Sequence, residues 1–428
     1  MVERRWAITR VVRPLKAVDP LLDLITDAGP IQGTTGVCTH VPLCFPQTLW
    51  ANHIVLPPLF AHKLNRTNTR GQKRVGSLMI GIILSARYLR NKERATNNEH
   101  VLFYMKLARK NRVDLCFYSP ANVSARTQSV TGYVYSHQDD SLTRITVPIP
   151  RINLYKINSS LRNRSSNRQI IQVKEKRDVI FYNLCTKKER SKYLDYNYLK
   201  TFNSIRPLLP ATETLQYDTL VNMLKKYNTV FIKPKRGGQG NRIRIIRQKG
   251  DHYTITYINK KIKREKSIAK KKLSDYFTQE FTHPSRFIVQ QGISLKKYRG
   301  NKFDFRVSPQ KNKDDKWQIT GMIARVASAG WDVTNIDQGG RVVGRVKKLI
   351  PPQTRKEIYR KAILVARALE QRFPYLNDLG LDFAVDKEGK VWFLEANFRP
   401  NRKKAAVKRN RIPFEHVCAV YKSERRQR

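Results

Sequence analysis

Residues 379–401 read LGLDFAVDKEGKVWFLEANFRPN, with two short apolar runs on either side of the turn-forming cluster DKEGK. Apolar runs around such a cluster predict a β-hairpin. If its loop is the four residues 387–390, Asp382 lies directly opposite Glu395 across the ladder. Asn397 then shares a face with Glu395, because side chains alternate along a strand. Three oxygen ligands converge in this arrangement, and hard divalent cations such as Mg²⁺ bind clusters of this kind.

Two alternatives remain open for this hairpin. A register slip of one residue would send Asp382 to the other face and remove it from the cluster. The hairpin could also face solvent and carry ordinary surface acids. Glu395 favours the metal site, because it continues the apolar run Val391–Leu394 and a carboxylate in such surroundings needs a partner.

The composition predicts a folded protein with polyanionic partners. The chain has 428 residues, of which 40% are hydrophobic and 10% aromatic, enough for about two or three domains. It has 84 Lys and Arg against 33 Asp and Glu, a formal net charge of +51. Such a field attracts nucleic acids, anionic polymers and anionic membrane surfaces. The charge indicates a class of partner and says nothing about catalysis.

Three features predict a cytoplasmic protein without a transmembrane segment. The five cysteines are scattered and odd in number, which indicates a reducing compartment. The N-terminal stretch MVERRWAITRVVRPLK is charged and lacks the apolar core of a signal peptide. The longest apolar run, near residues 78–84, is far too short to span a bilayer.

The first part of the chain predicts a βαβ unit. Residues 1–74 mix Pro, Thr and basic residues with short apolar runs and contain no motif or repeat. Residues 77–84 are almost continuously apolar, as expected for a strand buried on both faces. A helix over 98–112 and a second strand over 113–118 complete the unit. The apolar stripe of this helix comprises Val101, Leu102, Met105 and Ala108.

The pattern then predicts strands at residues 132–135 and 146–149 and a loop at 158–168. A pair of helices is expected within residues 194–228. The second of these helices, over 214–227, carries an apolar stripe. Thr212 or Thr214 is a candidate cap at its N-terminus.

Residues 229–246 read TVFIKPKRGGQGNRIRII, a strand ending in Lys-Pro, a loop with three glycines and a second strand. Gly237, Gly238 and Gly240 would let backbone N–H groups approach phosphate oxygens, and Lys233 adds a point charge. The loop lacks the G-x-x-x-x-G-K-[ST] arrangement and lies between strands, so it is neither a P-loop nor a dinucleotide-binding turn. A mobile basic hairpin turn is an equally good interpretation of this loop.

Residues 259–272, NKKIKREKSIAKKK, hold eight basic residues and one acid. A solvated helix or loop face explains this composition, and so does a contact with a polyanion. Aromatic residues are not interleaved with the charges, so base stacking is not supported.

The C-terminal third alternates strands, a loop and a helix. We expect a buried strand at residues 286–293 and two alternating strands at 303–307 and 317–326. A polar loop is expected at 334–341 and an amphipathic helix at 353–373. Asp304 and Arg306 share one face of their strand, because side chains alternate with period two. The helix stripe comprises Ile358, Ala362, Val365 and Leu369. The chain is expected to end in a basic tail, 413–428, that frays from Ser423.

Taken in this order, the elements resemble the ATP-grasp superfamily of carboxylate–amine and carboxylate–thiol ligases, and within it the YheC/YheD family of endospore coat-associated proteins. The likeness covers about residues 76–404. Besides the Lys-Pro strand and the glycine loop, it is carried by FIVQQGI (287–293), KFDFRV (302–307), TGMIARVA (320–327), TNIDQGGR (334–341) and LGLDFAVDKEGKVWFLEANFRP (379–400). The ordered set is specific, whereas no single member of it is.

The resemblance implies an α/β (α+β) fold in which two α+β subdomains surround a nucleotide cleft, preceded by a βαβ pre-ATP-grasp domain. The implied divisions are an N-terminal basic extension at 1–74, the pre-ATP-grasp domain at 75–193, the ATP-grasp domain at 194–412 and the basic tail at 413–428. Within the ATP-grasp domain, a lid-bearing subdomain would occupy 194–290 and a metal-binding subdomain 291–412.

The resemblance also implies roles for individual residues. The residues that would bind ATP are Lys233, Gly237, Gly238, Gly240, Gln290, Gln291 and Ile293. The residues that would hold one or two Mg²⁺ ions are Asp382, Glu395 and Asn397. The residues that would act in catalysis are Arg306, Arg325 and Asn335. The lysine would contact the α- or β-phosphate, the glycines would form a lid over the triphosphate, and residues 290–293 would hold the adenine edge.

The implied chemistry has two steps, on a carboxylate substrate and a nucleophile that are both unknown. The carboxylate attacks the γ-phosphate of ATP to form an acyl phosphate, and an amine or similar nucleophile then displaces phosphate. The first step needs charge dispersal more than a general base, and Mg²⁺, Lys and Arg supply it. The residues agree, since the motifs contain oxygen ligands and cations but no Ser/His/Asp or Cys/His arrangement.

Two departures from the family pattern keep other functions open. Small residues and a glycine are expected after Asn397, but Phe398, Arg399 and Pro400 follow, and Arg399 could contact substrate or phosphate. The net charge also exceeds what the fold needs. A spore-coat scaffold on an ATP-grasp fold, with anionic polymers or coat proteins bound to its basic surface, is the main alternative. Sequence-specific nucleic-acid binding has no motif to support it.

Overall fold

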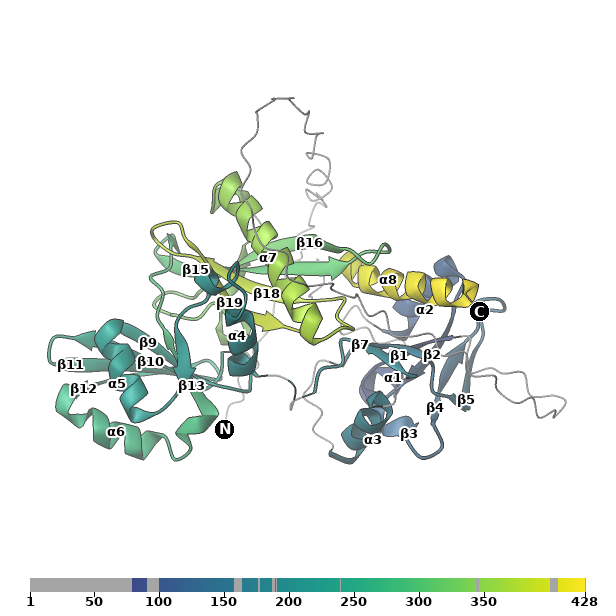
Figure 1. The fold of residues 1–428 in the computed structure, drawn as a ribbon, viewed down its shortest axis with the longest axis horizontal. Coiled ribbons are helices and arrows are strands. Elements are labelled where there is room, and N and C mark those ends of the chain that lie inside the picture. Colours follow the sequence, from purple (N-terminus) through teal and green to yellow (C-terminus); the bar gives the residue numbers. More distant parts are fainter. Residues whose placement is uncertain are drawn as a thin grey trace, which may run out of the picture. The chain divides into compact units, whose positions relative to one another are not determined.

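The computed structural model describes residues 79–90, 100–157, 164–175, 178–186, 189, 191–238, 240–343, 346–400 and 407–427. All of them belong to the unit Thr69–Arg428, one of two compact units in the chain. The N-terminal extension expected at 1–74 lies outside the described residues. Three β-sheets with covering helices make up the described part (Figure 1).

The first sheet contains the predicted βαβ unit. Strand β1 (Met79–Ile83) is buried along its whole length and pairs in parallel with β2 (Asp114–Tyr118), with α2 (Val101–Asn111) between them in the chain. The sheet order is β3-β4-β2-β1-β6-β7, with β5 on β4. The other elements here are α1 (Ala86–Arg90), η3 (Pro120–Asn122), β3 (Val123–Ser124), β4 (Ser129–Tyr135), β5 (Leu142–Pro148), β6 (Ile152–Tyr155), α3 (Arg164–Lys174) and β7 (Ile180–Tyr182).

Two local predictions in this part were wrong. Leu102 is 45% exposed, and the buried stripe of α2 is Val101, Tyr104 and Ala108. The stripe turns with the helical period, so Tyr104 rather than Leu102 follows Val101 on the core face. The loop expected at 158–168 is cut short by α3, which begins at Arg164.

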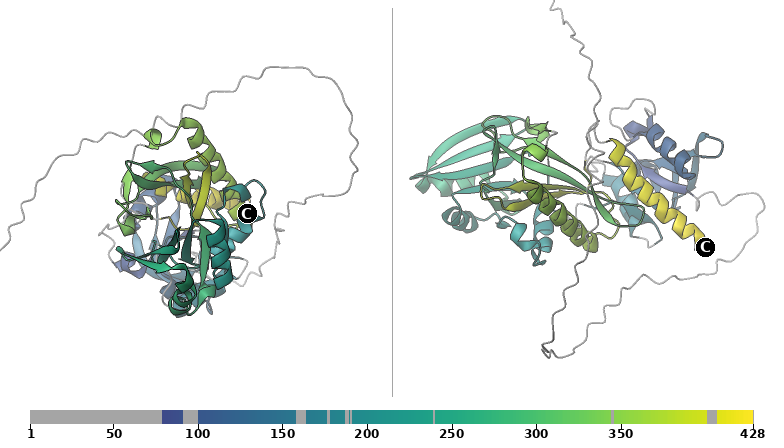
Figure 2. Two further views of the ribbon diagram at one scale, coloured as in Figure 1. Left: turned by 90° about the vertical axis from the view of Figure 1, so that its left-hand side faces the viewer. Right: turned by 90° about the horizontal axis from the view of Figure 1, so that it is seen from above.

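The basic tail predicted from residue 413 is part of helix α8 (Val407–Arg426). Phe414, Val417, Cys418 and Tyr421 are buried in the same core as α2 and the first sheet. Figures 1 and 2 show this helix, in yellow, beside the blue elements of that sheet. These four positions have the spacing of one helix face, and burial of that face keeps the helix ordered through Ser423, where fraying was expected.

The second sheet is antiparallel throughout and carries the glycine loop. Its order is β12-β11-β10-β9-β13-β8. Its elements are α4 (Lys192–Lys200), η4 (Arg206–Leu208), β8 (Thr212–Thr214), α5 (Tyr217–Lys226), β9 (Thr229–Pro234), β10 (Ile243–Lys249), β11 (His252–Asn259), β12 (Ile262–Ala269), η5 (Lys270–Lys272), α6 (Leu273–Glu280), η6 (Pro284–Arg286) and β13 (Phe287–Gln291). The predicted caps Thr212 and Thr214 lie in β8, and Gln216 is the N-cap of α5, without a side-chain bond.

The third sheet holds the hairpin from which the sequence was interpreted. Its order is β17-β16-β15-β18-β19, with β14 on β15. Its elements are β14 (Lys297–Tyr298), β15 (Asn301–Lys311), β16 (Trp317–Val326), η7 (Ile336–Gln338), β17 (Arg341–Val343), η8 (Val346–Lys348), α7 (Pro352–Arg372), β18 (Gly380–Val385) and β19 (Val391–Asn397). The predicted stripe of α7 is confirmed, since Ile358, Ala362, Val365 and Leu369 are all buried against this sheet.

The hairpin reaches the predicted pairing by a different route. Val385 pairs with Val391, so the loop is Asp386–Lys390, five residues instead of four. That loop alone would place Asp382 opposite Leu394. A register irregularity between Asp382 and Phe383 adds one residue on β19 and restores the pair Asp382–Glu395. Bulges of this kind re-aim side chains next to functional sites.

Candidate functional site

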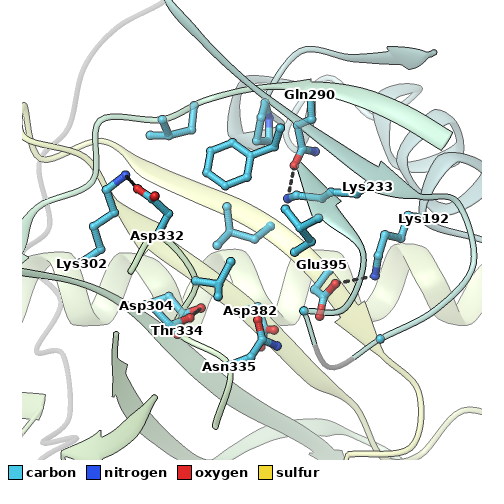
Figure 3. Close-up of a pocket in the computed structure, with 18 of the residues that line it drawn as sticks. Lys192, Lys233, Gln290, Lys302, Asp304, Asp332, Thr334, Asn335, Asp382 and Glu395 are labelled. Carbon is cyan, nitrogen blue, oxygen red and sulfur yellow. Dashed lines mark hydrogen bonds and ion pairs between the residues drawn. The ribbon is translucent and has the colours of Figure 1, made fainter. Parts of the chain in front are cut away.

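One pocket is lined by residues of the second and third sheets and of the loops beside them (Figure 3). It contains every predicted site residue except Arg306 and Asn397. Its ionic side chains are balanced, with four cations and four acids, although the chain is strongly basic. They are Lys192, Lys233, Lys302, Arg325, Asp304, Asp332, Asp382 and Glu395.

Lys233 is held at the end of β9 by a chain of hydrogen bonds. Its Nζ donates to Oε1 of Gln290 at 2.7 Å (Figure 3). Nε2 of Gln290 in turn donates to Oγ1 of Thr212 at 2.8 Å. Burial lowers the pKa of Lys233 to about 8, against an opposing effect of Glu395. The side-chain amide of Gln290 therefore positions the lysine, and it is not available to a ligand in this arrangement.

The segment after β13 is anchored through its main chain. The backbone N–H of Gln291 donates to the carbonyl of Ala211 at 2.8 Å, and that of Gly292 donates to Thr229 at 2.8 Å. The side chain of Gln291 accepts from the backbone N–H of Ala211. Apolar side chains from strands of both sheets and from the loops beside them also line the pocket, and we call them its apolar wall. They are Phe231, Ile243, Ile293, Leu295, Val333 and Leu394.

The glycine loop has open space on one side and a close neighbour at its end. Gly237 has φ +134°, and a Cβ placed there or at Gly238 would meet no atom within 4 Å. Gly240 has φ +68°, and its Cβ would lie 2.8 Å from Oδ1 of Asn335. The structure thus brings the glycine loop together with the predicted polar loop 334–341, which contains Asn335 and is called the asparagine loop below.

Cationic side chains lie beside Glu395 of the cross-strand pair Asp382–Glu395, called the ladder pair below. Nζ of Lys192 donates to Oε2 of Glu395 at 2.7 Å (Figure 3). Nδ2 of Asn397 donates to Oε1 of Glu395 at 3.5 Å, although Asn397 itself does not line the pocket. Burial alone would raise the pKa of Glu395, but Lys192, Arg306 and Lys233 outweigh it and hold that pKa well below the ordinary value.

Asp382 belongs to a buried network of alternating charges. Arg306 donates to both of its carboxylate oxygens, and Nη2 of Arg325 lies 3.0 Å from Oδ2. Arg325 also donates to Asp304 through Nε at 2.7 Å and Nη2 at 2.5 Å, and Thr334 donates to the same carboxylate at 2.5 Å. Burial raises the pKa of Asp382, and the two arginines oppose that effect.

The network places the two predicted arginines differently. Arg325 is 5% exposed and lines the pocket, whereas Arg306, the cross-strand partner of Asp382, is not among the lining residues. Both guanidinium groups are bound to carboxylates of the chain. Arg399, expected as a possible contact for substrate or phosphate, donates to the carbonyls of Ile157 and Cys185 and is not among the residues that line the pocket.

Several lining residues were missed from the sequence. Asp304 could have been found, since the alternating pattern of residues 303–307 places it on the same strand face as Arg306. Lys192 gave no signal, because it is one of many lysines and reaches Glu395 only through the fold, as the first residue of α4 after the N-cap Ser191. Lys302 and Asp332, which both line the pocket and pair at 2.8 Å, gave none either.

Asp382, Glu395 and Asn397 are a mixed donor set of two carboxylates and an amide. Within the described residues, no group of three or more His, Cys, Asp or Glu side chains forms a metal-binding cluster. A magnesium site therefore depends on the carboxylate pair with the asparagine and phosphate oxygens.

Among the described helices, none has the length and apolar composition of a membrane span.

Comparison with known proteins matches these features to one family. The model of the YheC/D like ATP-grasp family matches residues 183–418. The endospore coat-associated protein YheD of Bacillus subtilis (strain 168) is 29% identical over 204 residues, 46% of this chain and 45% of YheD. The endospore coat-associated protein YheC of the same organism is 22% identical over 216 residues, 48% of this chain and 58% of YheC. The chain thus spans about half the length of these curated relatives.

Among solved structures, the VanG D-Ala:D-Ser ligase from Enterococcus faecalis superposes with a TM-score of 0.45 and 11% sequence identity. The alignment covers 81% of this chain and 99% of that ligase. N5-carboxyaminoimidazole synthetase from Staphylococcus aureus superposes with a TM-score of 0.45 and 9% identity, over 81% of this chain and 78% of the synthetase.

Proposed function

The chain belongs to the YheC/D-like ATP-grasp family and has an ATP-grasp fold, and from this premise we propose that it is an ATP- and Mg²⁺-dependent ligase. It activates a carboxylate as an acyl phosphate for attack by an amine or similar nucleophile. The observation that carries this proposal is the meeting in one pocket of two lysines, the glycine loop and the ladder pair Asp382–Glu395. These groups come from four separate segments of the chain.

In this proposal the triphosphate of ATP binds beside Lys192 and Lys233. Both ammonium groups lie in the pocket, and a lysine acts on phosphate as a point charge. The open space next to Gly237 and Gly238 supports close approach of the loop backbone to phosphate oxygens. The adenine base packs on the apolar wall that includes Ile293.

The donor set at β18 and β19 fits Mg²⁺. Asp382 and Glu395 face each other across the ladder, and each already attracts a cationic group in the structure. With Asn397 they offer hard oxygen ligands, and phosphate oxygens can complete the shell. Mg²⁺, when bound there, would disperse negative charge on those phosphate oxygens. The ammonium group of Lys192 would then leave Glu395 or share this carboxylate with the ion. A lysine released in this way is free to contact the nucleotide.

The remaining pocket residues suit phosphoryl transfer to a carboxylate. An oxygen of the substrate carboxylate attacks the γ-phosphorus, and the bond to the bridging oxygen breaks, so that ADP leaves. The nucleophile then attacks the acyl carbon and phosphate leaves. Arg325 and Lys233 disperse charge during the first transfer. Asn335, which touches the glycine loop, lies close to the transferred group, and Arg306 positions Asp382 through two hydrogen bonds.

A second candidate function is a nucleotide-binding scaffold of the spore coat without ligase activity. It is favoured by one observation, that Arg306 and Arg325 are both committed to carboxylates of the chain. The names of the relatives motivate the proposal that this protein too is associated with the endospore coat. A ligase and a scaffold differ in whether ATP is consumed when an acceptor is present.

The test is to trap the acyl phosphate. The full chain is incubated with ATP, MgCl₂, hydroxylamine and, in turn, each member of a panel of carboxylic acids. The proposal predicts carboxylate-dependent release of ADP together with a hydroxamate. Glu395→Gln should abolish both, whereas Glu388→Gln, an exposed acid in the loop of the same hairpin, should change neither. ATP binding without ADP release for every carboxylate would support the scaffold.

A further inference from the structure

The second sheet ends in a strongly basic strand. We define the lid edge as residues 260–272, which comprise the Lys260–Lys261 turn, strand β12 and the η5 turn. It contains eight basic residues and one acid. Strand β12 ends its sheet, and β11 is its only partner among the described strands. No described strand pairs with the main-chain groups on its outer side.

The turn at the start of the lid edge is strained and held at the pocket. Lys260 and Lys261 both adopt left-handed backbone conformations, with φ +46° and +66°, which side chains other than Gly, Asn and Asp rarely adopt. The N–H of Lys260 donates to Oδ1 of the pocket residue Asn241 at 3.0 Å. The N–H of Lys261 donates to Oε1 of Gln338, in the asparagine loop, at 2.8 Å. One end of the lid edge therefore lies at the pocket mouth.

The ladder register identifies which main-chain groups face outward. Asn259 pairs with Ile262 around the two-residue turn, and in such a hairpin this pair exchanges both hydrogen bonds. Hydrogen-bonded and non-bonded pairs then alternate along β12. The N–H and C=O groups of Lys263, Glu265 and Ser267 consequently point away from β11.

The charge of the lid edge selects the composition of that strand. Lys263 pairs with Glu265 at 3.6 Å and Lys272 with Asp275 at 3.4 Å. No ion pair within the described residues involves the exposed side chains of Lys260, Arg264 or Lys271. Lysines on an edge strand normally prevent pairing with other chains, but against an acidic strand the same charges attract.

Two other occupants fit the lid edge less well. A second copy of this chain offers no acidic strand, since the printed sequence never has more than two consecutive acids, at Asp139–Asp140 and Asp314–Asp315. A nucleic acid cannot use the outward main-chain groups as a strand does, and residues 260–272 contain no aromatic side chain for base stacking.

We propose that an extended acidic polypeptide pairs with β12 as an additional strand and is the carboxylate-bearing acceptor of the reaction. The proposal rests on the ligase function proposed above. Main-chain bonds to the outward groups of β12 supply register, and the basic side chains supply attraction for glutamate and aspartate. The polypeptide continues past the Lys260–Lys261 turn, where Asn241 and Gly240 line the pocket. The substrate is thus a polymer with many carboxylates.

The test measures binding of fluorescein-labelled decaglutamate to the full chain by anisotropy. Ser267→Pro removes one outward N–H without changing charge, because an edge strand tolerates proline where its N–H faces solvent. The proposal predicts about a tenfold loss of affinity for this variant, and at least as much for Arg264→Glu/Lys271→Glu. The control Lys356→Glu/Arg360→Glu reverses two exposed charges on α7 and should change affinity less than about threefold.

The outcomes separate this proposal from its premise. Unchanged affinity in Ser267→Pro, equal losses in the lid-edge and α7 charge variants, or tighter binding of an oligothymidylate of the same charge would each overturn strand pairing. ATP affinity is measured on the same proteins and should be equal in all of them. Decaglutamate binding without ATP binding would remove the ligase function and leave a polypeptide-binding edge. ATP binding without decaglutamate binding would remove only the acceptor proposal.

Discussion

Asp304→Asn tests the buried network that fixes Arg325 in the pocket. The side chains of Arg325 and Asp304 are 6% and 5% exposed and share two hydrogen bonds of 2.7 and 2.5 Å, and Asp304 also accepts from Thr334 at 2.5 Å. Asparagine keeps the size of the side chain and one acceptor oxygen but removes the charge. Among the described residues, Asp382, at 3.0 Å, is then the remaining carboxylate that pairs with Arg325.

The expected loss of stability follows from these contacts. Hydrogen bonds to charged groups contribute about 1.5–3 kcal/mol each, and removal of one partner from a buried ion pair costs about 3–5 kcal/mol. Because Asp382 still neutralises Arg325, we expect Asp304→Asn to lower the free energy of unfolding by about 2–3 kcal/mol. The lost bond from Thr334 should also loosen the asparagine loop.

Urea unfolding followed by tryptophan fluorescence measures this loss. The three tryptophans in the described residues, at positions 317, 331 and 392, all lie in the part of the chain that contains the network. Asp314→Asn, the same substitution in the exposed turn between β15 and β16, is the control and should change stability by less than about 0.5 kcal/mol. An equally small change in Asp304→Asn would refute the assigned role of the network.

Three further predictions follow from single contacts. Burial lowers the pKa of Lys233 to about 8, so this lysine loses its charge as the pH rises through 8. ATP affinity, measured by calorimetry, should therefore fall about tenfold for each pH unit above 8, and Lys233→Arg should abolish this decline. Gly240→Ala should lower the free energy of unfolding by about 1–3 kcal/mol in thermal unfolding, and it should slow the formation of ADP because it displaces Asn335. Gly250→Ala, also at positive φ but with open space around it, should lower stability without slowing ADP formation. Phe414→Ala should destabilise the first sheet by about 3–5 kcal/mol in urea unfolding, because Phe414 is fully buried in its core; a free basic tail would show no change.

Much of the fold could be predicted because its elements have clear periods. The buried run at β1, the stripe of α7 and the alternation of β15 each follow from one repeat length. The pairing of Asp382 with Glu395 was predicted as well, but from a loop of the wrong length. Loop length and bulge cancel in this hairpin, and the apolar pattern is the same for both combinations, so the sequence cannot distinguish them.

The remaining features depend on contacts between distant segments. The excess of basic residues near the C-terminus obscured the apolar face of α8, whose partner core is formed far earlier in the chain. Lys192 and Glu395 are 203 positions apart, and no local pattern relates them. The commitment of Gln290 to Lys233, instead of to a ligand, likewise follows from the pairing of β13 with β9.

The most direct test of the central claim is calorimetry of ATP binding with and without Mg²⁺. It compares the wild type with the Glu395→Gln/Asn397→Ala double variant, which removes ligands and leaves the lysines in place. We predict Mg²⁺-dependent ATP binding in the wild type and loss of the Mg²⁺ dependence in the variant. The absence of ATP binding to the folded wild type, or equal Mg²⁺-dependent binding in both proteins, would contradict the assignment of this pocket as the nucleotide site.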